Sequence, residues 1–470
     1  MCGEILFRSP GAASLRFGRR AFSPYLCIMK LASLLGHATE LLQRVRSSGK
    51  PADSIIDAFF RSHKYLGSHD RRFIAEATYG TLRHLRKCEH LLLKSLDSAG
   101  DDVVPADGIL LLLVTYLLAV DRRTRIVPED LQPVLKSGNL KPRLSSILDA
   151  ISASSELTAG EPIALKHSFP DWMVARFVEQ YSEAEAEELC KGLNEQAPVT
   201  LRVNELKTTV EACQQALRAE GIETVRTSLS PIGLQVSKRL NVFQLQAFRS
   251  GFFEVQDEGS QLLPLILDPK PTARVLDACA GAGGKTLEFA SLMKNRGEIV
   301  ASDVHTSRLE ELRKRTRRAG VSDVRIQHIE DVPDLEIKFK GYFDVVLIDA
   351  PCSGIGTVRR NPGMKWMVTE ESVRELSEKQ FHIFDAGASL VAPGGVLAYA
   401  TCTLFREENE GVVERFLRAH PEFSLVPAPP RNSRFDSTPY FNDGYIRFFP
   451  HRDGTDGFFV AVLQKQGRAS

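Results

Sequence analysis

The feature that most constrains the fold of this chain is a repeated alternation of strand-like and helix-like segments over residues 273–464. Short runs rich in β-branched residues, typical of buried strands, are separated by stretches with the three- and four-residue apolar spacing of helices. The strand-like runs read RVLDACA, EIVASDV, VRIQHI, DVVLIDA, GVLAYATC and FFVAVLQK. Such repeated units predict the α/β class, with a doubly wound, mostly parallel sheet and a ligand at the carboxyl ends of its strands.

The remainder of the 470 residues leaves room for further domains, because a domain takes about 150 residues. Residues 31–158 have helical spacing almost throughout and predict an all-α domain, in which the apolar run at 108–120 is a buried helix too short to cross a bilayer. Residues 160–270 predict linker helices, with one helix over 171–195, and then a small α+β unit. We assign the α/β domain to residues 271–466.

The composition excludes several classes of protein. With 43% hydrophobic and 25% charged residues, the chain is expected to fold as a globular protein. The net charge of +1 excludes a global polycation, so a nucleic acid would have to be bound by local patches. The eight cysteines include no C-x-x-C pair and no histidine at zinc-finger spacing, so we expect no metal. We also expect no membrane association.

Residues 1–30 contain five basic residues and one acidic residue. A mitochondrial transit peptide would share this bias. We favour an overextended or disordered N-terminus, because helical spacing does not begin until Leu31. Scattered cysteines without a signal peptide indicate a reducing compartment, so we expect the protein in the cytoplasm, with mitochondria as the alternative.

A glycine loop, DACAGAGGKT at residues 277–286, follows the first strand of the α/β domain and begins a helix. Glycines there allow the backbone and its free amides to approach a ligand. A phosphate-binding P-loop would need glycine at Cys279, and a dinucleotide motif would need glycine at Thr286. The next strand ends in Asp303, which could accept hydrogen bonds from two ribose hydroxyls. A ribose cofactor without phosphate fits best and predicts S-adenosyl-L-methionine, although a tight strand-to-helix joint would also explain the glycines.

Two cysteines follow two other strands of the predicted sheet. Asp349 and Cys352 come after DVVLID, and Cys402 comes after GVLAYAT. C5 of cytosine is a poor nucleophile, but a thiolate that adds to C6 makes C5 reactive toward a methyl donor. Asp349 could serve as the acid at N3 if it is protonated or shares a proton. The spacing alone does not distinguish the two thiols, and a single cysteine is more often a small buried hydrophobic residue.

The motifs around these residues resemble those of the RNA cytosine-5 methyltransferases of the RsmB and Nol/Nop/Sun kind, which have a Rossmann-like class I methyltransferase domain. The matching segments are VQDEGSQL at 255–262, DAPCSG at 349–354, RRNP at 359–362 with KW at 365–366, TC at 401–402, ENE at 408–410 and DGFF at 456–459. The resemblance implies that Cys402 is the nucleophile and that Cys352 assists release of the methylated product. It also implies that the cofactor contacts are Cys279, Ala280, Gly281, Ala282, Gly283, Gly284, Lys285, Asp303, Asp331 and Asp349.

The chain departs from the family pattern at two positions. The family usually has AAPGGKT where this chain reads AGAGGKT, so Ala282 replaces a stiffening proline and we expect a more flexible loop. Arg315 stands where asparagine is common and lies in a basic run over residues 313–318. It could be an RNA contact or part of a solvated helix face.

The N-terminal part is similar to the NusB-like RNA-binding domain, through DRRF at 70–73 and YGTLR at 79–83. Basic residues cluster there, and they predict either an RNA contact or a solvated helix face: Arg71, Arg72, Arg83, Arg86 and Lys87. The domain order resembles the small-subunit ribosomal RNA branch of the family.

We therefore expect a monomer that methylates an exposed cytosine in structured RNA, with 16S rRNA as the first candidate and tRNA as the second. A non-catalytic assembly factor is the alternative. Methylation of an exocyclic adenine amine is disfavoured because residues 349–352 read DAPC, which lacks the second proline and the aromatic residue of that motif.

Overall fold

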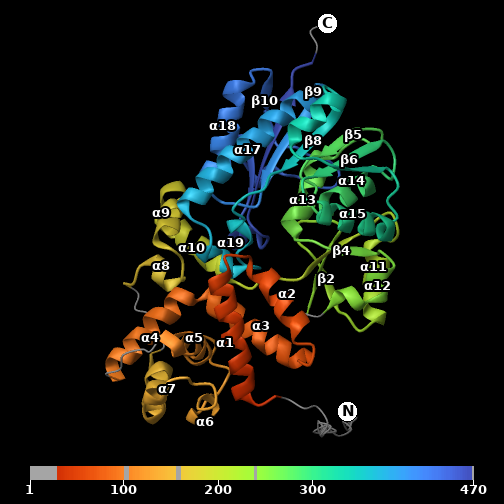
Figure 1. The fold of residues 1–470 in the computed structure, drawn as a ribbon. Helices are drawn as coiled ribbons and strands as arrows, with labels where there is room; N and C mark the ends of the chain where they lie inside the picture. The colour runs from red at the N-terminus through yellow and green to blue at the C-terminus, as the bar shows by residue number, and fades with distance from the viewer. Residues whose placement is uncertain (1–28, 100–104, 155–159, 238–240, 468–470) are drawn as a thin grey trace, which may run out of the picture.

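The computed structural model describes residues 29–99, 105–154, 160–237 and 241–467 (Figure 1). The prediction for residues 1–30 therefore lies almost entirely outside the described residues. The first described helix, α1, begins at Leu31, where helical spacing begins in the sequence. In the described part of the chain, no helix has the length and apolar character that crossing a membrane requires.

The N-terminal part is all helical, as predicted. Its helices pack around one apolar core, to which α1 contributes the side chains of one face, such as Leu34, Leu41 and Leu42. The apolar run at 108–120 is buried, and its second half continues as a π-helix over Tyr116–Asp121. The elements are α1 (Leu31–Ser48), α2 (Ala52–Ser62), α3 (Ser68–Arg83), α4 (Leu85–Ala99), α5 (Pro105–Thr115), α6 (Pro128–Leu131) and α7 (Leu144–Ala153).

Three helices follow: α8 (Ile163–Lys166), α9 (Asp171–Gln180) and α10 (Glu183–Asn194). The prediction of one helix over 171–195 was wrong. The helix stops at Tyr181, and Ser182 begins a new one by accepting a hydrogen bond from the backbone amide of Glu185. α9 and α10 pack against residues of the C-terminal part, including Phe405 and Phe449.

A small α+β unit follows these helices. Its four-stranded antiparallel sheet has the order β2-β3-β1-β4, and two helices contribute to its core. Its elements are β1 (Thr200–Val203), α11 (Val210–Ala219), β2 (Thr224–Arg226), β3 (Gly233–Val236), α12 (Gln246–Arg249) and β4 (Phe253–Val255). α13 (Glu258–Leu267) leaves this unit and packs its apolar residues into the core of the large sheet.

The C-terminal part is a Rossmann-like, mostly parallel sheet, as predicted. Its order is β11-β12-β13-β9-β8-β5-β6-β7, with β10 beside β13, and β5 to β9 run parallel. The strands are β5 (Arg274–Asp277), β6 (Glu298–Asp303), β7 (Val324–His328), β8 (Phe343–Asp349), β9 (Val391–Thr401), β10 (Phe423–Leu425), β11 (Phe441–Asn442), β12 (Tyr445–Phe448) and β13 (Phe458–Lys465). β13 is antiparallel to β9, and β10 to β12 were not predicted.

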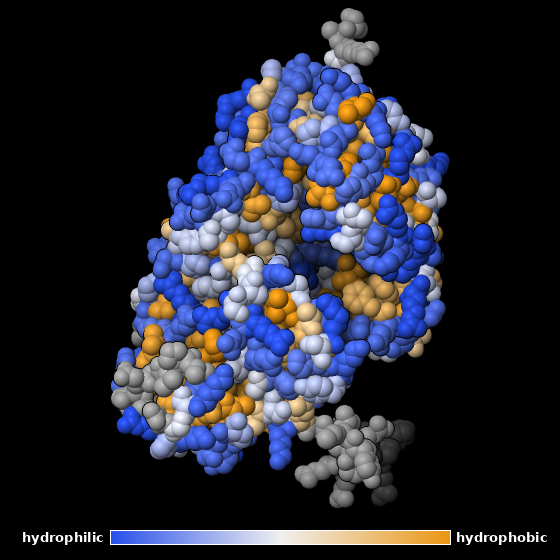
Figure 2. Space-filling view, in the orientation of Figure 1, coloured by the Kyte–Doolittle hydropathy of each residue, from blue (hydrophilic) through white to orange (hydrophobic). Residues whose placement is uncertain are grey.

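Helices connect these strands: α14 (Gly284–Leu292), α15 (Thr306–Ala319), α16 (Glu336–Phe339), α17 (Glu370–Leu390), α18 (Glu410–Ala419) and α19 (Pro450–Asp453). Figure 1 shows the large sheet above the N-terminal helices, with the small α+β unit at the lower right. Figure 2 shows that this face of the molecule is hollowed near its middle, between the large sheet and the N-terminal helices. The predicted domain boundaries stay a prediction.

A buried lysine joins the N-terminal helices to the C-terminal part. Lys365 is fully buried, and its Nζ donates to the carbonyls of Arg83 and Ser168 and to Asn194 Oδ1 at 2.7–2.9 Å. Beside it, Trp366 Nε1 donates to the carbonyl of Leu82 at 2.7 Å. The KW motif of the sequence therefore fastens the two parts of the chain together.

Two of the five clustered basic residues lie in this same junction rather than on a solvated helix face. Arg83 donates to the carbonyl of Arg359 at 2.8 Å. Arg86 donates to the carbonyl of Phe169 and makes a two-pronged contact with the Asp171 carboxylate at 2.8 and 2.9 Å. For Arg83 and Arg86, the interpretation as a solvated helix face was wrong, because a sequence cluster does not show which partners the fold brings to it, and the RNA contact stays a prediction.

Candidate active site

The glycine loop joins β5 to α14 and is shaped by two glycines. Gly281 and Gly283 have φ of 55° and 85°, a region in which glycine is favoured. Asp303, at the end of β6, holds this loop: its carboxylate accepts hydrogen bonds from the amides of Gly281 and His305 at 2.9 and 2.8 Å. A Cβ at Gly281 would meet no atom within 4 Å, so the space over the loop is open.

The base of the loop is held by a buried carboxyl. Asp277 Oδ2 accepts a hydrogen bond from Thr286 Oγ1 at 2.7 Å, which ties the end of β5 to the first turn of α14. Burial raises the pKa of Asp277 to about 6. Asp277 thus ties the two ends of the loop together, Asp303 holds its middle at Gly281, and the loop faces a cavity.

This cavity has a volume of about 670 Å³ and lies at the carboxyl ends of β5, β6, β8 and β9. It brings together nearly all of the predicted site residues: Cys279, Ala280, Gly281, Ala282, Gly284, Lys285, Asp303, Asp331, Asp349, Cys352 and Cys402. Gly283 lies behind this lining, where an added Cβ would be 2.0 Å from Leu312 Cδ1. Its contribution is close packing of the loop against α15.

The two predicted thiols are in contact. Cys352 Sγ and Cys402 Sγ are 3.4 Å apart, because their loops follow the neighbouring strands β8 and β9. The hydrogen bond with Cys402 and burial both raise the pKa of Cys352 well above its usual range. Either sulfur could donate the hydrogen bond to the other.

A charged pair lies between the thiols and the glycine loop. Lys285 Nζ contacts Asp349 Oδ2 at 2.5 Å. Burial acts to lower the pKa of Lys285, but the Asp349 carboxylate outweighs it and the pKa is raised. The lysine stays an ammonium, and its proton is shared with a carboxylate that lines the cavity.

A buried glutamate that sequence reasoning did not single out holds the two cysteine loops together. Glu408 is fully buried and accepts hydrogen bonds from the Ser353 amide at 2.8 Å and from Thr403 Oγ1 at 2.8 Å, so it contacts the residue that follows each cysteine. Gln380 Nε2 donates to the same carboxyl at 2.9 Å. Glu408 belongs to the ENE motif of the sequence, but the motif alone did not indicate that this residue holds the cysteine loops.

Asp331 lies at the edge of the cavity in an exposed ion pair. Its Oδ2 contacts His382 Nε2 at 2.9 Å, and its Oδ1 accepts from the amide of Val332 at 2.8 Å. The side chain is 48% exposed. It is accessible to a ligand, while the backbone contact fixes its position.

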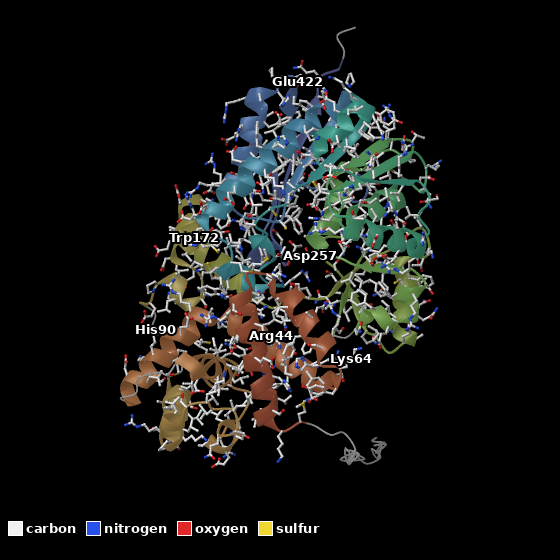
Figure 3. The ribbon with its side chains drawn as sticks, in the orientation of Figure 1. Arg44, Lys64, His90, Trp172, Asp257 and Glu422 are labelled. Carbon is white, nitrogen blue, oxygen red and sulfur yellow. The ribbon has the colours of Figure 1, made fainter. Side chains whose placement is uncertain are left out.

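Three of the motif segments meet at one arginine outside the cavity. Arg360 donates to Asp257 Oδ2 and Asp456 Oδ2 at 2.5 and 2.6 Å. Burial, with the nearby Asp257, raises the pKa of Asp456 to about 6. Figure 3 shows Asp257 near the middle of the molecule. Arg360 therefore ties Asp257, which caps α13, to Asp456, which lies just before β13.

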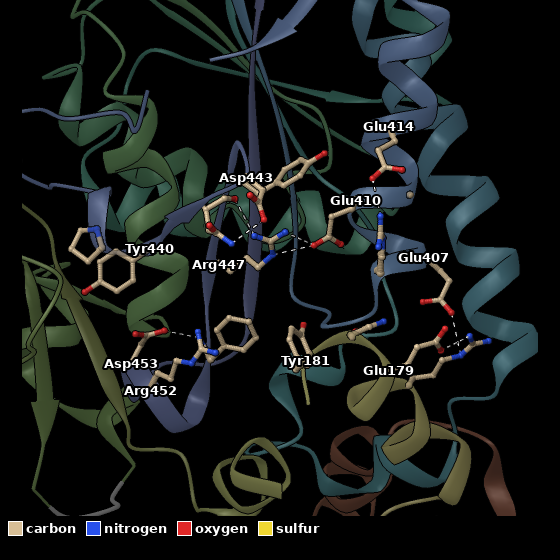
Figure 4. Close-up of a pocket in the computed structure, with 18 residues that line it drawn as sticks. Glu179, Tyr181, Glu407, Glu410, Glu414, Tyr440, Asp443, Arg447, Arg452 and Asp453 are labelled. Carbon is tan, nitrogen blue, oxygen red and sulfur yellow. Dashed lines mark hydrogen bonds and ion pairs between the residues drawn. The ribbon is translucent and has the colours of Figure 1, made fainter. Parts of the chain in front are cut away.

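A second cavity of about 800 Å³ lies between α9, α18 and α19 (Figure 4). It is larger than the first, but its charges already have partners: Arg447 contacts Glu410 at 2.5 Å and Arg176 contacts Glu407 at 3.3 Å. It contains neither a thiol nor a glycine loop. The smaller cavity is therefore the candidate active site.

One group of side chains has metal-ligand character. The ligand atoms of His37, Glu40 and His63 lie within 4.8 Å of one another in the N-terminal helices. Glu40 is already paired with Arg44 at 2.5 Å, and none of these residues lines the candidate active site. The predicted absence of a metal stays a prediction.

Comparison with known proteins decides the family. A family model described as 16S rRNA methyltransferase RsmB/F matches residues 264–464, and a model of the ferredoxin-like domain of RsmF/B-like methyltransferases matches residues 169–243. The chain is 30% identical over 454 residues to the probable ribosomal RNA small subunit methyltransferase B of Bacillus subtilis, across 93% of this chain and 100% of that protein. The chain belongs to the RsmB/F family of RNA methyltransferases.

Other relatives agree with the RsmB/F assignment. The chain is 31% identical to the probable ribosomal RNA small subunit methyltransferase B of Synechocystis, across 90% of this chain and 98% of that protein. A crystal structure titled PH0851 superposes with a TM-score of 0.75 at 29% identity and covers 94% of this chain and 100% of its own. The predicted family and fold class are confirmed, including the all-helical N-terminal part and the Rossmann-like sheet.

Proposed function

We propose that the protein transfers a methyl group from S-adenosyl-L-methionine to C5 of a cytosine in small-subunit rRNA, through a covalent bond between Cys402 and C6. The contact of 3.4 Å between two thiols carries the proposal, because both lie in the same cavity as a glycine loop and the Asp303 carboxylate. Membership of the RsmB/F family supports RNA as the methyl acceptor, and the names of the relatives support rRNA.

The cavity fits S-adenosyl-L-methionine, which would supply the methyl group. The open space over Gly281 accommodates the cofactor beside the loop amides. Asp303 keeps its remaining lone pairs for ribose hydroxyls, since each carboxylate oxygen accepts one backbone hydrogen bond here. Asp331 and the carboxylate of Asp349 line the same space. We propose these residues, with the glycine loop, as the cofactor contacts.

The thiols have different roles in the proposed reaction. Either sulfur could donate the hydrogen bond to the other, so the contact does not distinguish the thiols, and the family resemblance implies Cys402 as the nucleophile. Cys402 adds to C6, and the Lys285–Asp349 pair supplies a proton at N3 as charge develops there. After methyl transfer, a base takes the C5 proton, the C5–C6 double bond reforms as the Cys402 thiolate leaves, and N3 returns its proton to the Lys285–Asp349 pair. Cys352 assists that step.

Bisulfite sequencing of cellular RNA tests the proposed substrate. Unmethylated cytosine is converted to uracil, whereas 5-methylcytosine resists conversion. In cells that lack the protein, we expect one small-subunit rRNA cytosine to become convertible and an active copy of the gene to restore its resistance. If instead a tRNA cytosine becomes convertible while the rRNA cytosines stay resistant to bisulfite, the substrate is tRNA. Unchanged methylation in every RNA would favour a non-catalytic assembly factor.

A further inference from the structure

Arg315 links the glycine loop to the small α+β unit. From α15, its Nη1 donates to the carbonyl of Ala282 at 2.9 Å, and its Nε and Nη2 donate to Glu254 Oε2 at 3.1 and 2.9 Å. The Arg315 side chain is 15% exposed and that of Glu254 is 4% exposed. Arg315 is thus not part of a solvated helix face, and three of the five N–H donors of its guanidinium bind the protein's own acceptors.

Glu254 is itself firmly anchored. It lies on β4, and Arg318 donates to both of its oxygens at 2.6 and 2.7 Å while stacking over the Phe248 ring at 4.0 Å. An arginine of the small α+β unit acts nearby: Arg202, fully buried on β1, donates to the carbonyl of Gly284 at 3.2 Å. The unit therefore holds the loop directly at Gly284, and indirectly at Ala282 through the contact of Glu254 with Arg315.

The loop needs such support because of its sequence. Ala282 lies between two glycines of positive φ, and glycine loses more conformational freedom on ordering than any other residue. The proline that would stiffen this position in the family is absent. A charge-assisted hydrogen bond to the carbonyl of Ala282 restricts the loop before a ligand binds, and a pre-ordered loop loses less entropy on binding.

We propose that Arg315 is a positioning residue that holds the glycine loop in its cofactor-binding shape and couples cofactor binding to the small α+β unit. This inference rests on the proposed function, in which the loop binds S-adenosyl-L-methionine. Arg315 lines the candidate active-site cavity, but its three hydrogen bonds go to Ala282 and Glu254, so we expect it to act through the loop carbonyl. Its loss therefore affects cofactor affinity and KM rather than kcat.

The chain provides a matched control one turn along the same helix. Both Arg315→Gln and Arg318→Gln remove contacts with Glu254, and Arg318→Gln also removes the stacking on Phe248, but only Arg315→Gln removes the contact with Ala282. By calorimetry of the full-length protein with S-adenosyl-L-methionine, we expect Arg315→Gln to weaken binding about tenfold and Arg318→Gln to change it less than twofold. Hydrogen exchange of the amides at 280–285 should be faster in Arg315→Gln alone, and kcat at saturating cofactor should be unchanged.

Each other outcome overturns the inference. Unchanged cofactor affinity in Arg315→Gln would show that the loop keeps its shape without Arg315. Equal loss of cofactor affinity in both variants would assign the effect to Glu254. If Arg315→Gln does not fold, Arg315→Lys keeps the charge but not the two-sided reach, and wild-type affinity in that variant would also contradict the inference. Failure of the proposed function has a different signature, because the wild type would then bind no cofactor and Asp303→Ala would change nothing.

Discussion

Replacing Cys352 by alanine is expected to trap a covalent protein–RNA adduct. If Cys402 adds to C6 and Cys352 assists its expulsion, the variant can form the carbon–sulfur bond but breaks it slowly. The adduct should survive denaturing electrophoresis, require S-adenosyl-L-methionine for its accumulation after methyl transfer, and carry one methyl group per RNA. Mass spectrometry of the digested adduct should locate the modified cysteine at position 402.

The second thiol provides the matched comparison. Cys402→Ala should abolish turnover and form no adduct, and the double variant should also form none. Cys190→Ala serves as a control, because Cys190 is fully buried in α10 and burial raises its pKa to about 12. Adduct in Cys402→Ala and none in Cys352→Ala would exchange the two roles. Full activity in both single variants would refute covalent catalysis.

Replacing Lys365 by methionine is expected to lower the free energy of unfolding by about 3 kcal/mol, because three acceptors each lose their donor at about 1 kcal/mol. Burial lowers the pKa of Lys365 well below its usual range, and methionine does not carry that desolvation cost. We expect the lost hydrogen bonds to dominate, since three acceptors lose their donor at once and the carbonyl of Ser168 belongs to a buried residue. Denaturant unfolding measures the change.

The exposed Lys338 on α16 supplies the control for this experiment. Lys338→Met makes the same chemical change at the surface and should alter stability by less than about 0.5 kcal/mol. If the junction forms as described, unfolding of Lys365→Met should separate into two transitions, with the N-terminal helices melting first. Equal stability of the two variants would mean that Lys365 does not fasten the N-terminal helices to the rest of the protein.

The site could be predicted from the sequence because of how strands align. The glycine loop, Asp303, Asp349 and the two cysteines each follow a strand, and parallel strands end at one edge of a sheet. Any fold with those strands adjacent brings these residues together. The 3.4 Å contact between Cys352 and Cys402 follows because β8 and β9 are neighbours.

What could not be predicted depends on contacts between residues far apart in the chain. Arg83 and Arg86 were read as a surface cluster, but their partners lie on segments that the fold brings to α3 and α4. Glu408 lies six residues after Cys402, yet it also holds the residue after Cys352. The break at Tyr181 follows from Ser182 capping a new helix, which apolar spacing alone does not reveal.

The two departures from the family pattern lie far apart in the sequence, but the folded structure brings them into contact. Ala282 and Arg315 are separated by 33 positions, and their hydrogen bond joins the residue that lacks the proline to the residue that replaces asparagine. The expected flexibility of the loop was based on the first departure alone. The structure shows that Arg315 of α15, which also contacts Glu254 of β4, holds the loop at the carbonyl of Ala282.

The central claim is that a methyl group replaces the hydrogen on C5 of a cytosine, and release of tritium from C5 tests it most directly. Small-subunit RNA that carries [5-³H]cytosine is incubated with the protein and S-adenosyl-L-methionine, and tritium in water is counted against methyl groups transferred. We predict one tritium released for each methyl group with the wild type, and no release with Cys402→Ala. Methyl transfer with the tritium retained in the RNA would contradict the account.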